Sequence, residues 1–294
     1  MTDPRLQVCR VDDGEAIHYL DIGQGRPIVI LHGWTSNHQE WLSYAEALAE
    51  DYRVLAWDAR GHSDHHYRSG STVTVQRMAD DLHRLIEHNS LQRPILVGHS
   101  MGALTIWEYI ARHGDGHLGG LCLIDQSPKL VTDDNWRLGI YGNFSIERNR
   151  AFIDHLRTDF AEAVLQLAAN GNNPRTAESY RRNTRGFQRL RQYLKTLQAE
   201  PLTECWASLT AADYRELLPR ITVPVLLVYG DLSTFYSTET ARYVHDRIPD
   251  NRLFIYEGTD HSPHLWQRDR FIDDLRSFAD RLNDGSVKEL TDRV

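Results

Sequence analysis

The sequence predicts an α/β fold: a doubly wound, mostly parallel sheet with an antiparallel start and a helical insertion. Short, fully apolar runs of strand length, such as Ile28–Leu31, alternate with longer segments of helical periodicity. Strands that are apolar throughout are typical of parallel pairing with helices on both faces of the sheet. Two extended segments precede this alternation, and one long stretch within it contains no strand-like run. A length of 294 residues, 41% of them apolar, allows one sizeable core.

The chain opens with two extended segments, 6–11 and 16–22, which Asp12-Asp13-Gly14 joins with the chemistry of a hairpin turn. This hairpin predicts the antiparallel start. From Pro27 onward the alternation becomes regular. We expect, in chain order, a strand at 28–31, a helix at 38–49, a strand at 53–57, a helix at 75–89, a strand at 95–97, a helix at 101–113 and a strand at 118–124.

The alternation breaks between Gln126 and about Pro219. This stretch is rich in Arg, Asn and Gln and carries apolar residues at helical spacing, such as Ile153, Leu156 and Phe160. We therefore predict a helical cap at 126–219, inserted into a core formed by residues 1–125 and 220–294. The core pattern resumes with a strand at 223–229, a helix at 238–247, a strand at 253–256 and a helix at 268–282.

Charge and composition limit the classes of partner. The formal net charge is −8 and no basic stripe stands out, so binding to a nucleic acid backbone is unfavourable. No segment can span a bilayer, and the first residues lead into no apolar signal region. Cys9, Cys122 and Cys205 lack C-x-x-C spacing and are expected to be buried thiols. We expect a cytoplasmic protein with a small-molecule substrate and neither a nucleic acid nor a membrane partner, and leave a homodimer open.

The strongest local signal is Gly98-His99-Ser100-Met101-Gly102, a G-x-S-x-G pattern between an apolar strand and a helix-period run. A nucleophile on a sharp strand-to-helix turn needs strained backbone angles, and flanking glycines remove side chains that would clash there. The turn exposes the hydroxyl at a helix N-terminus, where backbone N–H groups favour developing negative charge. We therefore predict Ser100 as a nucleophile. The competing interpretation is a glycine-rich turn with an incidental serine.

The tripeptide His32-Gly33-Trp34 directly follows the strand at 28–31. In folds with such a serine turn, one oxyanion donor comes from this loop and the other from the residue after the nucleophile. The predicted donors are the backbone N–H groups of Trp34 and Met101.

Four motifs together resemble the α/β-hydrolase superfamily: His32-Gly33-Trp34, the DARGHS segment at 58–63, the pentapeptide around Ser100, and Gly258-Thr259-Asp260-His261. The chain is most similar to the esterase and non-haem haloperoxidase (perhydrolase) branch, with some resemblance to cofactor-independent 2,4-dioxygenases. The resemblance covers residues 26–124 and 223–278 well and the insertion hardly at all. It implies the α/β-hydrolase fold, and it agrees with Trp34 and Met101 as oxyanion donors.

The general base is predicted from its position, because any one of fifteen histidines is a weak candidate by itself. His261 follows the strand at 253–256 across a short loop, which is where the last member of a Ser, Asp, His chain order arrives. His264 competes three residues later, but the family pattern places the catalytic histidine first. We therefore favour His261.

The acid is where this sequence departs from the family pattern. Most relatives read G-x-x-D after the strand at 223–229, whereas this chain reads Gly230-Asp231-Leu232-Ser233, with serine at the expected carboxylate. Asp231 and Asp125 each follow a strand, and ligand-side residues of such sheets lie at the carboxyl ends of strands. A minority of the superfamily places its acid after the strand that Asp125 follows. We favour Asp125, with Asp231 as the alternative.

The presumed pocket is expected to be apolar and rich in aromatic residues. The spacing of Asp58, His62, Asp64, His65 and His66 matches no standard ligand motif, so we expect no metal there, and no cofactor. The residues assigned to substrate binding are His32, His99, Trp136, Trp206 and Tyr236.

These parts predict a serine hydrolase that cleaves a small, fairly apolar carboxylic ester or lactone through an acyl-enzyme on Ser100. One alternative is a cofactor-independent dioxygenase in which the His261 and Asp125 pair deprotonates a heteroaromatic hydroxyl. Those enzymes tend to carry a histidine two residues after the tryptophan of the His-Gly-Trp motif, where this chain has Ser36. A second alternative is a ligand receptor built on the same fold.

Overall fold

The computed structural model describes residues 5–62, 72–284 and 292–293. One eight-stranded sheet forms the centre of the molecule, in the order β1-β2-β4-β3-β5-β6-β7-β8. The pairs β1–β2 and β2–β4 are antiparallel, and all later pairs are parallel. The strands are β1 (Leu6–Arg10), β2 (Ala16–Ile22), β3 (Arg26–Leu31), β4 (Tyr52–Trp57), β5 (Ile95–His99), β6 (Gly120–Ile124), β7 (Val225–Gly230) and β8 (Asn251–Tyr256).

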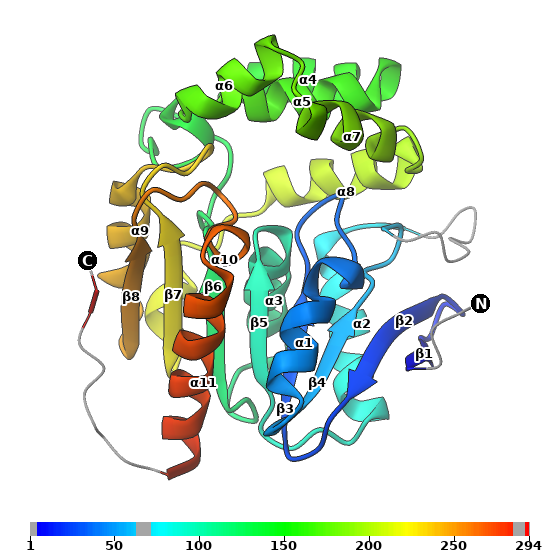
Figure 1. Cartoon of the computed structure of the whole chain (residues 1–294), viewed down its shortest axis with the longest axis vertical. Coiled ribbons are helices and arrows are strands. Elements are labelled where there is room, and N and C mark those ends of the chain that lie inside the picture. The colour runs from blue at the N-terminus through cyan, green and yellow to red at the C-terminus, as the bar shows by residue number, and fades with distance from the viewer. Residues whose placement is uncertain (1–4, 63–71, 285–291, 294) are drawn as a thin grey trace.

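Helices cover both faces of this sheet (Figure 1). On one face, α1 (Leu42–Leu48) and α11 (Arg268–Asp284) enclose an apolar core with Trp41 and Phe271 at its centre. On the other face, α2 (Val75–His88), α3 (Met101–His113) and α9 (Thr238–His245) contribute to a second and larger core. The apolar side chains of each parallel strand are divided between the two cores, which explains why these strands are apolar throughout.

The predicted fold is confirmed, and apart from the helix at 38–49 each expected element boundary lies within two residues of the observed one. The expected helix at 38–49 is divided: η1 (His38–Trp41) is a 3-10 turn, and α1 begins after it. Among the described residues, no helix combines the length and the apolar composition needed to cross a membrane.

The segment between β6 and β7 is helical and lies over the carboxyl ends of the parallel strands (Figure 1). Because these ends are where ligands bind in open α/β sheets, the helices close over the expected site. The elements of the segment are η2 (Ile140–Gly142), α4 (Ile146–Thr158), α5 (Phe160–Ala169), α6 (Pro174–Arg181), α7 (Arg185–Leu194), α8 (Ala199–Ala211) and η3 (Leu218–Arg220).

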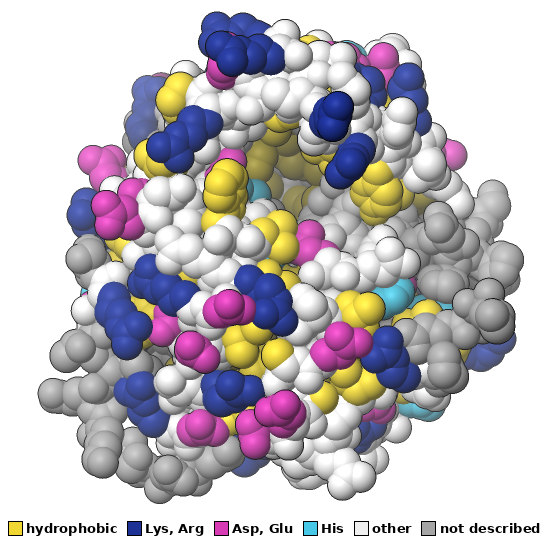
Figure 2. Space-filling model, viewed as in Figure 1, with side chains coloured by type: hydrophobic (Ala, Val, Ile, Leu, Met, Phe, Trp, Pro, Cys, Tyr) yellow, Lys and Arg dark blue, Asp and Glu magenta, His cyan; other side chains and the backbone are white. Residues whose placement is uncertain are grey.

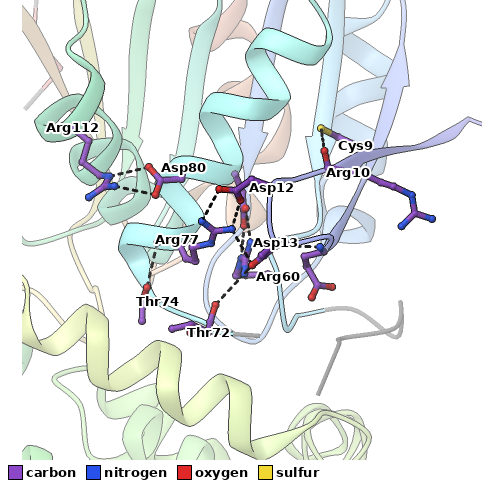
Figure 3. A network of polar contacts seen from close by, with 12 residues as sticks. Cys9, Arg10, Asp12, Asp13, Arg60, Thr72, Thr74, Arg77, Asp80 and Arg112 are labelled. Atoms are coloured by element: carbon purple, nitrogen blue, oxygen red, sulfur yellow. Dashed lines mark hydrogen bonds and ion pairs between the residues drawn. The ribbon is translucent and has the colours of Figure 1, made fainter. Parts of the chain in front are cut away.

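A buried arginine ties the antiparallel hairpin to the rest of the sheet (Figure 3). Arg60, in the loop after β4, binds both carboxylate oxygens of Asp81 on α2, at 2.5 and 2.6 Å. It also donates at 2.9 Å to Asp13 in the β1–β2 turn and at 3.1 Å to the carbonyl of Thr72. The planar guanidinium satisfies several acceptors at once, so it holds the loop after β4 close to the core.

Candidate active site

Ser100 occupies a sharp turn between β5 and α3. Its backbone angles, φ 52° and ψ −112°, are strained for a residue with a side chain. The turn also requires close approach of the backbone on both sides. A Cβ at Gly98 would lie 2.6 Å from the carbonyl carbon of Gly102, and a Cβ at Gly102 would lie 2.3 Å from the carbonyl oxygen of Leu31. The two glycines therefore permit the turn that presents the serine hydroxyl.

In the structure, the side chains of Ser100, His261 and Asp125 form a continuous chain of hydrogen-bond contacts. Nε2 of His261 lies 3.0 Å from Oγ of Ser100, and Nδ1 of His261 lies 3.0 Å from Oδ1 of Asp125. A carboxylate only accepts hydrogen bonds, so in the neutral ring Nδ1 carries the proton and Nε2 accepts from the serine hydroxyl. This arrangement can remove a proton from Ser100 and can stabilise the imidazolium that results.

Asp125 is fully buried at the end of β6, in a left-handed backbone conformation with φ 45°. Besides the bond from His261, its carboxylate accepts hydrogen bonds from the N–H of Gly230 at 2.9 Å and from Oγ of Ser233 at 2.8 Å. Burial raises the pKa of Asp125 above its ordinary value, and the hydrogen bonds from His261, Gly230 and Ser233 oppose that increase. Three donors fix the orientation of this carboxylate.

The alternative acid, Asp231, has a different environment. Its Oδ1 accepts a hydrogen bond of 3.2 Å from the N–H of Thr259, which links the loop after β7 to the loop after β8. The residue that the loop after β7 directs toward the buried carboxylate is Ser233, two positions later. Asp231 thus serves as a loop contact, whereas Asp125 contacts His261.

The loop that carries His261 is held on several sides. Asp260 accepts hydrogen bonds from the N–H of His261, from Thr234 and from Thr176. The carbonyl of His261 accepts a hydrogen bond of 3.0 Å from Nε2 of His99. The ring of Phe235 meets the imidazole edge to face, with 4.5 Å between ring centroids. These contacts limit the movement of the imidazole next to Ser100.

His264, the competing histidine, lies against aromatic side chains of the core. It is fully buried and stacks on Trp41, with 4.6 Å between ring centroids. Its Nε2 lies 3.3 Å from Oε1 of Glu40. Of the two histidines in this loop, His261 is therefore the one that contacts Ser100.

The two predicted oxyanion donors border the same cavity as Ser100. Met101 is the first residue of α3, so its N–H has no partner within the helix and lies at the positive end of the helix dipole. Trp34 begins a tight turn in which the N–H of Ser36 donates to the carbonyl of Gly33 at 3.1 Å. Among the described residues, neither the N–H of Trp34 nor that of Met101 has an acceptor. Both remain available for a developing oxyanion.

A cavity of about 490 Å³ lies between the sheet and the cap helices. Figure 2 shows it as a hollow whose interior is largely hydrophobic. Ser100, His261, His99 and Glu40 are among its polar lining residues. The apolar lining comes from both the core and the cap and includes Trp34, Met101, Leu104, Leu130, Ile140, Val164, Leu167, Ala168, Leu190, Trp206, Leu209 and Phe235. Most of the residues that the cap contributes to this lining belong to no sequence motif, and they were not predicted as site residues.

Of the residues assigned to substrate binding, His99, Trp206 and Tyr236 line this cavity, but His32 and Trp136 do not. His32 is fully buried, where it accepts from the N–H of Ala59 at 3.0 Å and contacts the carbonyl of Gly33 at 2.8 Å. The indole of Trp136 donates to the carbonyl of Lys129 at 2.8 Å and packs against other side chains of the protein. Both rings instead make structural contacts in the loops beside the cavity.

The histidine and aspartate group after β4 is only partly described. Asp58 accepts hydrogen bonds from the backbone N–H of His38, at 2.7 Å, and from its ring Nδ1, at 2.9 Å. His62 contacts the carbonyl of Arg60 at 2.9 Å. Asp58 and His62 therefore each make hydrogen-bond contacts with other groups of the protein. Asp64, His65 and His66 lie outside the described residues.

An eight-stranded sheet with a serine turn after β5, a histidine loop after β8 and a helical cover defines the α/β-hydrolase class. The alpha/beta hydrolase fold family matches residues 26–267, and the chain belongs to this family. Membership of this family makes it a hydrolase. Its relatives include esterases and haloperoxidases, which confirms the predicted resemblance to that branch of the superfamily.

Curated relatives are similar along nearly their whole length. A non-heme chloroperoxidase from Kitasatospora aureofaciens is 29% identical, with 94% of this chain and 100% of that protein covered. A pimeloyl-[acyl-carrier protein] methyl ester esterase from Vibrio cholerae is 27% identical, with 90% of this chain and 99% of that protein covered.

Solved structures show the same fold. The esterase EaEST from Exiguobacterium antarcticum superposes with a TM-score of 0.79 at 24% identity, covering 92% of this chain and 98% of that one. A bromoperoxidase from Bacillus anthracis superposes with a TM-score of 0.81 at 22% identity, covering 94% of this chain and 99% of that one.

Proposed function

We propose that this protein is a serine esterase that hydrolyses small, fairly apolar carboxylic esters or lactones through an acyl-enzyme on Ser100. The observation that carries the proposal is the line of two 3.0 Å contacts from Ser100 Oγ through the His261 ring to Asp125. An unaided serine hydroxyl is a weak nucleophile, and an adjacent, oriented general base is what activates it. Relatives named as esterases support the same class of reaction.

In the first half of the reaction, Oγ of Ser100 attacks the ester carbonyl carbon while its proton passes to Nε2 of His261. Asp125 holds the proton on Nδ1 and stabilises the positive ring. The carbonyl oxygen becomes negatively charged, and the N–H groups of Trp34 and Met101 donate to it. When the intermediate collapses, the bond to the alcohol oxygen breaks, and the alcohol leaves with the proton from His261.

The second half of the reaction repeats these steps with water as the nucleophile. His261 takes a proton from the water, which attacks the acyl carbon, and returns it to Oγ of Ser100 as the acid leaves. Because Asp125 is completely buried, it keeps its orientation through both halves.

The cavity indicates the size and polarity of the substrate. Its volume of about 490 Å³ accommodates a small molecule, and the apolar side chains of the core and cap favour an uncharged acyl or alcohol group. Neither Lys nor Arg is among its lining residues within the described part of the chain, so an anionic group inside the cavity would have no cationic partner.

The proposal is tested with a panel of p-nitrophenyl esters and lactones, with the wild type and Ser100→Ala compared in air and under anaerobic conditions. We expect oxygen-independent hydrolysis by the wild type and a loss of at least about 10⁴-fold in kcat for Ser100→Ala, as for other serine triads. Consumption of oxygen with a heteroaromatic hydroxy compound, retained in Ser100→Ala, would instead establish the cofactor-independent dioxygenase. Tight ligand binding without turnover would establish a receptor.

A second candidate reaction follows from the haloperoxidase relatives. The same acyl-enzyme can be attacked by hydrogen peroxide in place of water, which releases a peracid and restores Ser100. The test is halide oxidation in the presence of peroxide and a carboxylic acid, with Ser100→Ala as the control. Halide oxidation that persists in this variant would exclude the acyl-enzyme route.

A further inference from the structure

Three side chains with metal-binding atoms meet beside the active site, each from a different segment. Glu40 belongs to η1, His99 ends β5, and His264 belongs to α10 (Pro263–Trp266). One ligand atom from each lies within 4.8 Å of the other two. Oε1 of Glu40 is 3.3 Å from Nε2 of His264 and 3.9 Å from Nδ1 of His99.

His99 faces the carboxylate with a lone pair and not with a proton. Its Nε2 lies 3.0 Å from the carbonyl of His261, which only accepts, so Nε2 carries the ring proton. A neutral imidazole carries only that one proton. Nδ1 is then an acceptor directed at a second acceptor, the carboxylate of Glu40. A cation or a hydrogen-bond donor between them would satisfy both acceptors.

The described part of the chain does not provide such a group. Nδ1 of His99 is buried and has no hydrogen-bond partner among the described residues, and His99 as a whole is only 6% exposed. A buried polar atom without a partner costs free energy, so it points to a missing ligand. The backbone of Gly33 packs closely against this ring: a Cβ there would lie 2.9 Å from Nδ1, so only glycine fits at this position.

His264 completes the set with a ring whose direction is fixed. It is parallel to the ring of Trp41, at 4.6 Å, and its Nε2 is directed at Glu40. Two imidazoles and one carboxylate form a donor set that zinc uses in proteins, with the fourth position open to water or another ligand. Imidazole and carboxylate ligands also suit neighbouring divalent transition metals.

We propose that Glu40, His99 and His264 form a binding site for a divalent transition metal ion, with zinc as the best match. The ligands are Nδ1 of His99, Nε2 of His264 and a carboxylate oxygen of Glu40. They are widely separated in the sequence, so no spacing motif marks the site, and the sequence by itself predicts no metal there.

A metal at this position joins three segments that shape the active site. Glu40 follows the loop of Trp34, His99 precedes Ser100, and His264 lies three residues after His261. Metal on one nitrogen of His99 makes the opposite N–H a stronger donor to the carbonyl of His261. Binding should therefore raise the melting temperature, since a ligand that binds only the folded state stabilises it.

The test uses full-length protein freed of metal with EDTA and titrated with Zn²⁺ by calorimetry and with Co²⁺ by visible absorption. We expect one equivalent to bind, with the intense absorption of four-coordinate Co²⁺. Glu40→Gln and His264→Phe should each weaken binding by at least about 100-fold, the upper end of the range for residues that only support a metal ligand. Ser100→Ala should leave metal binding unchanged, which separates this site from the proposed esterase reaction.

The matched control is a separate pair of histidines, His83 and His113, whose rings stack at 4.1 Å near Asp80. Binding that is lost in His113→Asn and retained in Glu40→Gln would assign the metal to that surface pair and overturn the proposal. Failure of the wild type to bind either ion stoichiometrically would also overturn it. Circular dichroism of each variant shows that a loss of binding does not reflect unfolding.

Discussion

The hydroxyl of Ser233 donates a 2.8 Å hydrogen bond to Oδ1 of Asp125, the same oxygen that lies 3.0 Å from Nδ1 of His261. Ser233 stands in the loop after β7, where the family resemblance leads us to expect the acid. Because β6 and β7 are adjacent and parallel, their carboxyl ends present both residues to the same imidazole. The carboxylate follows β6, and a hydroxyl in the loop after β7 helps to orient it.

The identity of the acid is tested by a pair of substitutions. Asp125→Asn should lower kcat by roughly 10⁴-fold, because an amide no longer fixes the tautomer of His261 or stabilises its positive charge. Asp231→Asn should change kcat only slightly, since Asp231 contacts Thr259 and not the imidazole. The measurement is kcat of both variants with one ester. A large loss in Asp231→Asn with little change in Asp125→Asn would contradict the assignment of Asp125 as the acid.

Relocating the acid is a stricter test. Asp125→Asn combined with Ser233→Asp returns a carboxylate to the loop after β7, on the side from which Ser233 already reaches the site. We expect the double variant to recover at least 10-fold of the activity lost in Asp125→Asn, because orientation of the imidazole is what the acid supplies. Equal activities of the single and double variants would show that the two positions are not interchangeable.

The helical cap should control the chain length of the substrate. Ala168 on α5 lines the cavity, and Ala168→Phe fills part of it. We expect kcat/KM for a hexanoate ester to fall roughly 10-fold or more while that for acetate changes little, since a misfit of one or more methylenes costs about this much. Val164→Ala, which removes volume from the same helix, should shift the preference toward longer esters. Equal effects on both esters would place the acyl group elsewhere.

The charge of Glu40 should affect acid stability. Burial alone would raise the pKa of Glu40, but hydrogen bonds from His264 and Ser36 help to lower it from the ordinary 4.5 to about 2. A lowered folded-state pKa gives stability that is complete above pH 4.5 and is lost as the pH falls toward 2. In metal-free protein, Glu40→Gln should therefore lose less stability across this window than the wild type. Urea unfolding midpoints of the two proteins, measured across this pH range, show the difference in stability loss. Midpoints that fall in parallel for the wild type and Glu40→Gln would contradict the prediction.

The sequence predicts the elements that depend on local chemistry. The turn at Ser100 follows from its glycines, and the strands follow from their apolar runs. His261 follows from its position after the last strand. For the acid, the sequence favours Asp125 but keeps Asp231 as an alternative, because the alignment of β6 against β7 decides which carboxylate reaches the imidazole, and that alignment is a tertiary property.

The cavity wall was harder to predict. His32 and Trp136 have the residue types of a ligand site, but their ring nitrogens are used by the backbone of nearby loops. The cap residues that do line the cavity, such as Val164 and Leu190, are ordinary apolar residues of amphipathic helices. Which face of each helix meets the cavity depends on packing between helices, and no local pattern encodes it. The contact between Glu40 and His264 likewise joins residues from opposite ends of the chain.

The central claim is that Ser100 becomes covalently acylated during turnover. The direct measurement is mass spectrometry of the protein quenched in acid within the first turnovers of p-nitrophenyl butyrate. We predict the added mass of one butyryl group on the peptide that contains Ser100, formed and lost at least as fast as kcat, and absent from Ser100→Ala. Steady hydrolysis without any adduct, together with undiminished turnover by Ser100→Ala, would contradict the account.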